Sequence, residues 1–154
     1  MADTPIERDH QVELDTSLGY LLKEAASALH AAMEAELRPL GMTITHYSCL
    51  ELLAQRPGLS NSQLARGTFV TRQSMNVLLR ALERDGLVVR ASQAPVGRAL
   101  PTELTARGRA QRAKASAAVR DVEERMLAGL DADAQWLARG ILRAFVRSLG
   151  RPRV

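Results

Sequence analysis

The residues with the clearest chemical potential are hydrogen-bonding side chains on one face of a helix predicted over residues 71–85. Apolar residues at helical spacing mark the face that should meet a core, and they are Met75, Leu78, Leu79 and Leu82. The opposite face has no Glu or Lys, and its members are Gln73, Asn76, Val77 and Arg80, with Arg72 and Ser74 at the N-terminal end. Arg forms paired hydrogen bonds with guanine, Gln or Asn with adenine, and a small apolar side chain contacts a thymine methyl. This composition favours readout of duplex DNA over a face that is merely solvated.

Short elements on either side of this helix would hold it in place. Ser60 can cap a helix over 61–67, and a turn then leads to Thr71, the N-cap of the helix over 71–85. Two short helices joined by such a turn are typical of a helix-turn-helix. Gly86 should stop the second helix.

A β-hairpin is predicted after the second helix. A short β run at 87–89 and a second extended run at 99–104 are separated by a loop that contains Pro95 and Gly97. Because Pro101 has no N–H to donate, we expect the second strand to be an edge strand or a bulged one.

Long helices are predicted at both ends of the chain. Residues 16–38 form an amphipathic pattern, Thr45 can cap a helix that runs to about Gln55, and two further helices are expected within 106–150. The terminal helices are apolar on one side over a length that one small domain cannot cover. A second copy of the chain is the commonest source of the missing surface, so we expect a homodimer.

The positive charge of the chain is concentrated in its middle. Residues 1–55 hold three Lys or Arg against nine acids, residues 56–112 hold ten Arg against three acids, and residues 113–154 hold eight basic residues against five acids. A basic block between less basic ends is expected where phosphates are bound. A solvated face on a basic protein would give the same count.

Several classes of protein fit the sequence poorly. No apolar run approaches the roughly 18 residues of a membrane span, and a single cysteine, Cys49, fits the reducing cytoplasm. The three histidines, His10, His30 and His46, are isolated and lack the spacing of a zinc site. We find no nucleophile elbow, glycine-rich phosphate loop or set of acid, base and nucleophile. We therefore expect a cytoplasmic protein that is not an enzyme, with no cofactor, no metal and no membrane partner.

The stretch GLSNSQLARGTFVTRQSMNVLLRALERDGLVVR, followed by GRALPTELTARG, resembles the DNA-binding core of the MarR (multiple antibiotic resistance regulator) family. The similarity in order and length extends over about residues 14–150. The matching positions are Leu64-Ala65, Val70-Thr71, Leu82-Glu83, Gly86-Leu87-Val88, Arg90, and Leu104-Thr105 with Gly108.

This resemblance implies a mainly α fold with a small β-hairpin wing, which is a winged helix-turn-helix with N- and C-terminal dimerisation helices. It also implies an obligate homodimer that binds a palindromic operator in double-stranded DNA, with half-sites about one helical turn apart. We expect a flexible lead over 1–14 and a single domain over 15–150. Within that domain the DNA-binding winged helix spans about 42–104, and the dimerisation helices span about 16–38 and 106–150.

The DNA contacts divide by chemistry. The residues expected to contact bases are Gln73, Asn76, Val77 and Arg80. Those expected to contact phosphates or groove edges are Ser60, Ser62, Arg72 and Ser74. Arg90 is added from the basic strand that follows. Many family members carry Asp-Arg-Arg near the wing tip, whereas this chain has Val96-Gly97-Arg98. Arg98 is thus the candidate for the minor groove, and how the wing is braced without the acidic residue is open.

Ligand control is implied by the resemblance, because small aromatic anions often bind family members between the dimer helices and the DNA-binding lobe. Candidate lining residues are Tyr20, His30, His46, Tyr47 and Arg112, although ordinary packing and surface roles fit them equally well. The expected function is a transcription regulator, acting as a repressor that a small aromatic or phenolic ligand releases from DNA. Two alternatives stay open. One is a winged-helix module used only for protein–protein dimerisation, and the other is a redox-responsive regulator acting through Cys49.

Overall fold

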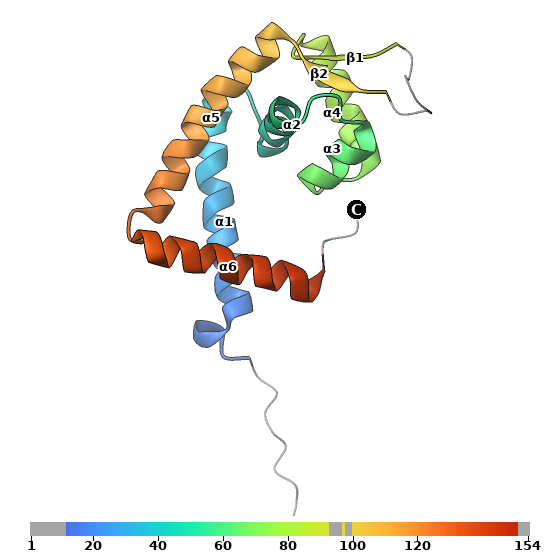
Figure 1. Ribbon diagram of the computed structural model, residues 1–154. Coiled ribbons are helices and arrows are strands. Elements are labelled where there is room, and N and C mark those ends of the chain that lie inside the picture. The colour runs from blue at the N-terminus through green and yellow to red at the C-terminus, as the bar shows by residue number, and fades with distance from the viewer. Residues whose placement is uncertain (1–11, 93–96, 98–99, 151–154) are drawn as a thin grey trace, which may run out of the picture.

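The computed structural model describes residues 12–92, 97 and 100–150. After the short 3-10 helix η1 (Leu14–Thr16), this described part of the chain is mainly helical and contains one hairpin, shown in Figure 1. Its elements are α1 (Leu18–Leu37), η2 (Arg38–Leu40), α2 (Ile44–Gln55), α3 (Asn61–Thr68), α4 (Arg72–Arg84), β1 (Val88–Arg90), β2 (Thr102–Leu104), α5 (Ala106–Leu127) and α6 (Ala132–Leu149). The predicted order of elements is confirmed. Within the described residues, no helix is both long and apolar enough to cross a membrane.

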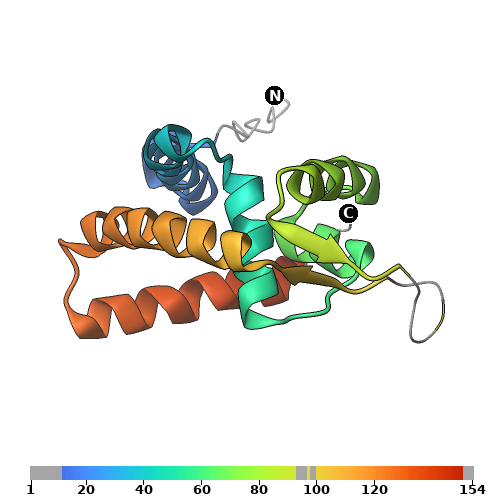
Figure 2. The ribbon, with the colours of Figure 1, turned by 90° about the horizontal axis from the view of Figure 1, so that it is seen from above.

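The molecule has a compact lobe and a set of long helices beside it. The lobe contains α2, α3, α4 and the hairpin, while α1 and α5 pack along each other and α5 also packs on α2 (Figures 1 and 2). The core of the lobe is made of buried apolar side chains from α2, α3, α4 and β1, and the largest are Leu50, Leu53, Leu64, Met75, Leu79 and Val88. Helix α6 turns back at the end of α5 and buries none of its residues.

The second helix begins two residues earlier than predicted. Thr43, rather than Thr45, is the N-cap, because its hydroxyl accepts the His46 N–H at 3.1 Å. The His46 ring completes a reciprocal pair, since its Nδ1 accepts the Thr43 N–H at 3.3 Å. Helix α2 therefore starts at Ile44.

The hairpin also differs in detail from the prediction. The first strand starts at Val88, because the Leu87 N–H is used to close α4 by bonding to the Leu82 carbonyl, next to Gly86 at φ +73°. The second strand shortens to Thr102–Leu104 and is an edge strand of the two-stranded sheet, as predicted. Thr102 pairs with Arg90 on one side and forms an isolated bridge with Leu59 on the other. Pro101 lies just before the strand and uses only its carbonyl, which accepts a hydrogen bond from Ala91.

The start of α5 is locked against the end of α4. The Thr105 hydroxyl donates to the Gly86 carbonyl at 2.6 Å, and the Thr105 N–H donates to the Leu87 carbonyl at 3.1 Å. Thr105 also caps α5 by accepting the Gly108 N–H at 3.0 Å. Gly108 lies so close to Leu87 that an added Cβ would overlap its backbone oxygen.

We predict that Gly108→Ala lowers the free energy of unfolding by about 1–3 kcal/mol, the range for overpacking a tight site. The added methyl group would clash with the Leu87 backbone, which cannot change rotamer as a side chain can. Urea denaturation would measure the change. Gly129→Ala is the matched control, because open space surrounds Gly129, and its effect should stay within about 0.5 kcal/mol. Equal effects of the two substitutions would contradict the close contact.

Candidate nucleic-acid interface

Helix α4 presents the two faces that the sequence predicts. Met75, Leu78, Leu79 and Leu82 are buried in the lobe. The opposite face is open to solvent at Gln73, Val77 and Arg80, and partly so at Asn76, with Val77 65% exposed. Since no acidic side chain belongs to this face, its donors and acceptors are available to an outside partner. Its chemistry suits base edges.

The N-terminus of α4 is set by a hydroxyl cap. The Thr71 Oγ1 accepts the Ser74 N–H at 3.1 Å and donates to the Ser74 Oγ at 2.9 Å. Ser74 is therefore part of the cap, and its own hydroxyl proton stays available for a phosphate. Arg72 is exposed in the same turn. The exposed first turn combines one arginine with the positive end of the helix dipole, an arrangement that attracts phosphates.

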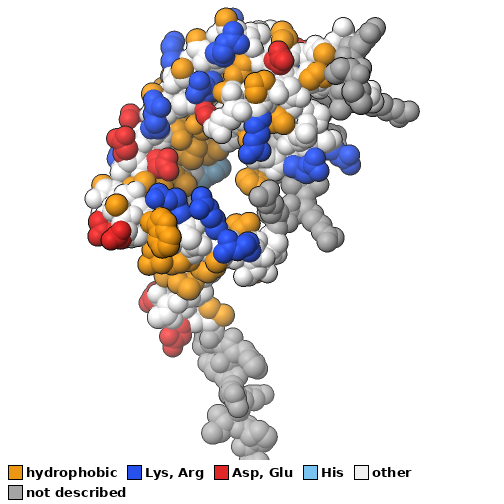
Figure 3. All heavy atoms as spheres, in the orientation of Figure 1, with side chains coloured by type: hydrophobic (Ala, Val, Ile, Leu, Met, Phe, Trp, Pro, Cys, Tyr) orange, Lys and Arg blue, Asp and Glu red, His pale blue; other side chains and the backbone are white. Residues whose placement is uncertain are grey.

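Helix α3 places the predicted serines at its own start. Ser60 forms a capping box with Gln63, in which the Ser60 oxygen accepts the Gln63 N–H at 3.3 Å and the Gln63 Oε1 accepts the Ser60 N–H at 2.9 Å. Ser62 lies in the first turn and is half-buried. Both serines keep a hydroxyl proton to donate. On the face shown in Figure 3, basic side chains project from the lobe beside α3 and α4.

Arg90 has a partner that the sequence did not reveal. Its guanidinium donates to the Glu83 carboxylate from Nε at 3.1 Å and from Nη2 at 2.7 Å. These hydrogen bonds hold the pKa of Glu83 below its ordinary value. Arg90 thus ties β1 to the last turn of α4, and its contact with DNA stays a prediction. The other wing arginine in the prediction, Arg98, lies outside the described residues.

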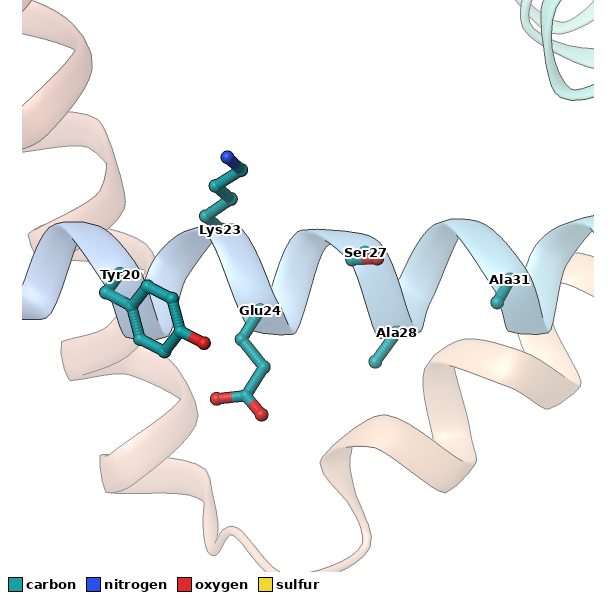
Figure 4. Close-up of a pocket in the computed structure, with 6 residues that line it drawn as sticks. All are labelled: Tyr20, Lys23, Glu24, Ser27, Ala28 and Ala31. Atoms are coloured by element: carbon teal, nitrogen blue, oxygen red, sulfur yellow. The ribbon is translucent and has the colours of Figure 1, made fainter. Parts of the chain in front are cut away.

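Among the described residues, the five candidate ligand residues lie at several different places. Tyr20 lines a shallow hollow of about 460 Å³ made only by residues of α1, where Figure 4 shows its ring beside Glu24. His46 instead lines a separate hollow of about 480 Å³ near Arg84 and Arg107. His30 is exposed on α1, 3.4 Å from Glu34. Burial lowers the pKa of His46, and the nearby Asp85 charge only partly opposes this.

Tyr47 and Arg112 belong to a polar cluster between α2 and α5 that sequence reasoning missed. At its centre the Glu51 carboxylate accepts from Ser116 Oγ at 2.7 Å and lies 3.6 Å from Arg112 Nη1. Burial alone would raise the pKa of Glu51, but hydrogen bonds from Gln55 and Ser116 and the Arg112 charge outweigh it and lower the pKa. For Tyr47, burial raises the pKa of the phenol. The cluster joins the lobe to the long helices.

Taken together, the lobe defines a winged helix-turn-helix protein, with α3 and α4 as the helix-turn-helix and the hairpin as the wing. The family model described as MarR family matches residues 40–99. The HTH-type transcriptional repressor Rv2887 of Mycobacterium tuberculosis is 47% identical over 121 residues, which cover 79% of this chain and 87% of that protein. The chain belongs to the MarR family.

Solved structures agree in fold over most of the chain. The Rv2887 protein in complex with DNA has a TM-score of 0.70 at 42% identity and covers 85% of this chain and 98% of its own. Its complex with salicylic acid has a TM-score of 0.68 at 44% identity, covering 85% and 97%. The transcriptional repressor CouR of Rhodococcus jostii RHA1, bound to a 23-mer DNA duplex, has a TM-score of 0.79 at 30% identity, covering 87% and 95%.

Cys49 is fully buried in the core of the lobe, and burial raises the pKa of its thiol to about 12. The thiolate is the reactive form of cysteine, and at pH 8 it is scarce when the pKa lies that high. The location and the raised pKa both argue against a peroxide sensor at this position.

We predict that iodoacetamide leaves Cys49 unmodified in the native protein at pH 8. In 8 M urea the thiol becomes accessible and its pKa returns to the ordinary range, so one adduct should form. Intact-mass spectrometry reads both states, and the unfolded sample is the control for reagent activity. Rapid native labelling, or a sulfenic acid after peroxide treatment, would restore Cys49 as a redox switch.

Proposed function

We propose that this chain is a homodimeric transcription regulator that binds a palindromic operator through α4 and represses transcription until a small aromatic acid binds. The observation that carries the proposal is the outer face of α4, where Gln73, Asn76, Val77 and Arg80 form an exposed surface without acids. The relatives add support, because one was crystallised with DNA and with salicylic acid. The protein would act by binding and would need no reaction of its own, and it would work in the cytoplasm where the DNA lies.

The proposed dimer follows from apolar side chains that one chain leaves uncovered. In α6 the Trp136 side chain is 73% exposed, and five further large apolar residues are exposed to solvent. In α1 the exposed apolar residues are Leu18, Tyr20, Leu21 and Leu22. Large exposed apolar surface marks an interaction site. In Figure 3 these hydrophobic side chains gather over α6 and the lower part of α1. A second copy of the same helices would cover them with self-complementary surface.

Ligand control in this proposal is a shift between two dimer geometries. One geometry holds the two α4 helices at the spacing of successive major grooves, and the other does not. An aromatic acid lowers the DNA-bound population by the ratio of its affinities for the two states. The lobe and the long helices would act as one domain over residues 15–150, because α5 is continuous with both.

Selection of bound duplexes from a random pool, repeated with salicylic acid, tests function and ligand response together. We expect a palindromic consensus, affinity that falls with salt as counterions are released, and weaker binding with the acid present. Sedimentation should give a dimer. If the protein is a dimer but shows no salt-dependent binding to any duplex, its function would instead be that of a module for protein–protein dimerisation.

We predict that Arg80→Ala weakens operator binding by about 1–3 kcal/mol and relaxes the preference at one base step. The control is Arg84→Ala, because Arg84 lies one turn further along α4, is 77% exposed and is 3.7 Å from Asp85. Its loss should leave the base preference unchanged. Binding titrations against the consensus and its single-step variants read the difference. A uniform loss over all sequences would make Arg80 a phosphate contact.

A further inference from the structure

The turn between α3 and α4 holds an aromatic residue in a backbone conformation that disfavours it. Phe69 has φ +60° and ψ +36°, and among the described residues it is the only non-glycine residue with positive φ. The conformation closes α3, because the amides of Phe69 and Val70 both donate to the Ala65 carbonyl. Glycine or asparagine closes a helix in this way with little steric cost, whereas a bulky side chain is strained there. Helix closure does not explain the choice of phenylalanine.

Packing within the chain does not explain it either. The Phe69 side chain is 67% exposed, while its neighbour Val70 packs against the core. An exposed ring gains little from the hydrophobic effect. Since strained residues persist where they serve a function, this outlier points to a contact with something outside the chain.

The position of Phe69 indicates which partner that is. It lies two residues before Thr71, the N-cap of α4, and so precedes the exposed Arg72 and Gln73 by three and four positions. The exposed apolar residues that we assign to the dimer lie instead on α1 and α6. In Figure 1 the α3–α4 turn belongs to the lobe and not to that set of long helices. Phe69 thus lies in the turn before the end of α4 that would enter the major groove.

We propose that Phe69 contacts DNA and that its ring packs on the methyl group of a thymine at the edge of the α4 site. The proposal rests on the DNA-binding function proposed above. The thymine methyl is the apolar group on the major-groove edge of the base pairs, and phenylalanine is among the side chains that contact it. Phe69 would then determine specificity at a base that the hydrogen-bonding residues of α4 do not read.

The test compares two substitutions that separate the ring from the backbone. Phe69→Asn removes the ring and suits the left-handed conformation, whereas Phe69→Tyr keeps both the ring and the strain. The probe is the duplex that the wild-type protein selects from a random pool. We expect the Asn variant to melt at or above the wild-type temperature, to stay dimeric and to bind about tenfold more weakly, as loss of a partly buried ring implies. The Tyr variant should bind within about twofold of the wild type.

Two further readouts identify the contact. The slope of affinity against salt should be the same for the wild type and the Asn variant, because no phosphate contact is lost. Replacing thymines one at a time by deoxyuridine, which lacks the methyl group, should weaken the wild type at one position that the Asn variant no longer senses. That lack of additivity is the signature of a direct contact.

The proposal is overturned if the Asn variant binds as tightly as the wild type, or if it melts at a lower temperature or loses the dimer. A changed salt slope without coupling to any thymine would also overturn it in favour of a backbone contact. In each of these cases a wild-type protein that binds its duplex leaves the proposed function standing. Failure of the wild type to select any duplex would remove both.

Discussion

The position of α4 relative to the long helices depends on a small set of hydrogen bonds where the end of α4 meets the start of α5. Thr105 uses its side chain and its backbone there at once, donating to Gly86 and to Leu87 while it caps α5. Gly108 allows the helix to approach the Leu87 backbone closely. Because α5 leads into α6, one of the helices proposed to form the dimer, this junction fixes the direction of α4 relative to the rest of the dimer. The motif Leu104-Thr105 with Gly108 is thus structural, and it matters for function because it orients the helix proposed to bind DNA.

A second connection makes this coupling rigid. The Glu51 cluster joins α2 to the middle of α5 through Ser116 and Arg112. A helix held at two places along its length cannot tilt against the lobe without breaking one of them. The lobe and its α5 should therefore move as one body, and a ligand would change the spacing of the two lobes and not the shape of either one. Rotation of rigid units about an interface is a common way for proteins to switch.

The sequence predicts the local features of this structure well and the tertiary polar contacts poorly. Ser60 and Thr71 were identifiable as caps because a hydroxyl residue directly before an amphipathic run predicts the start of a helix. The cap at Thr43 was missed because its partner at the third helical position is His46 and not the usual Glu or Gln. The pairing of Ser116 with Glu51 spans 65 positions, and no spacing rule connects residues so far apart. The left-handed conformation of Phe69 could not be predicted either, because bulky residues rarely adopt it.

The ion pair between Arg90 and Glu83 explains how the base of the wing is held without the usual acidic residue at its tip. It joins β1 to α4, while the pairing of Thr102 with Leu59 joins β2 to the segment that leads into α3. Both strands are thus fixed to the helix-turn-helix, and Glu83 supplies the carboxylate from α4 itself. The pair offsets the charge of Arg90, so phosphates near this strand meet less positive charge than the sequence suggests. The preference for particular DNA bases should then depend mainly on the exposed side chains of α4 and of the turn before it.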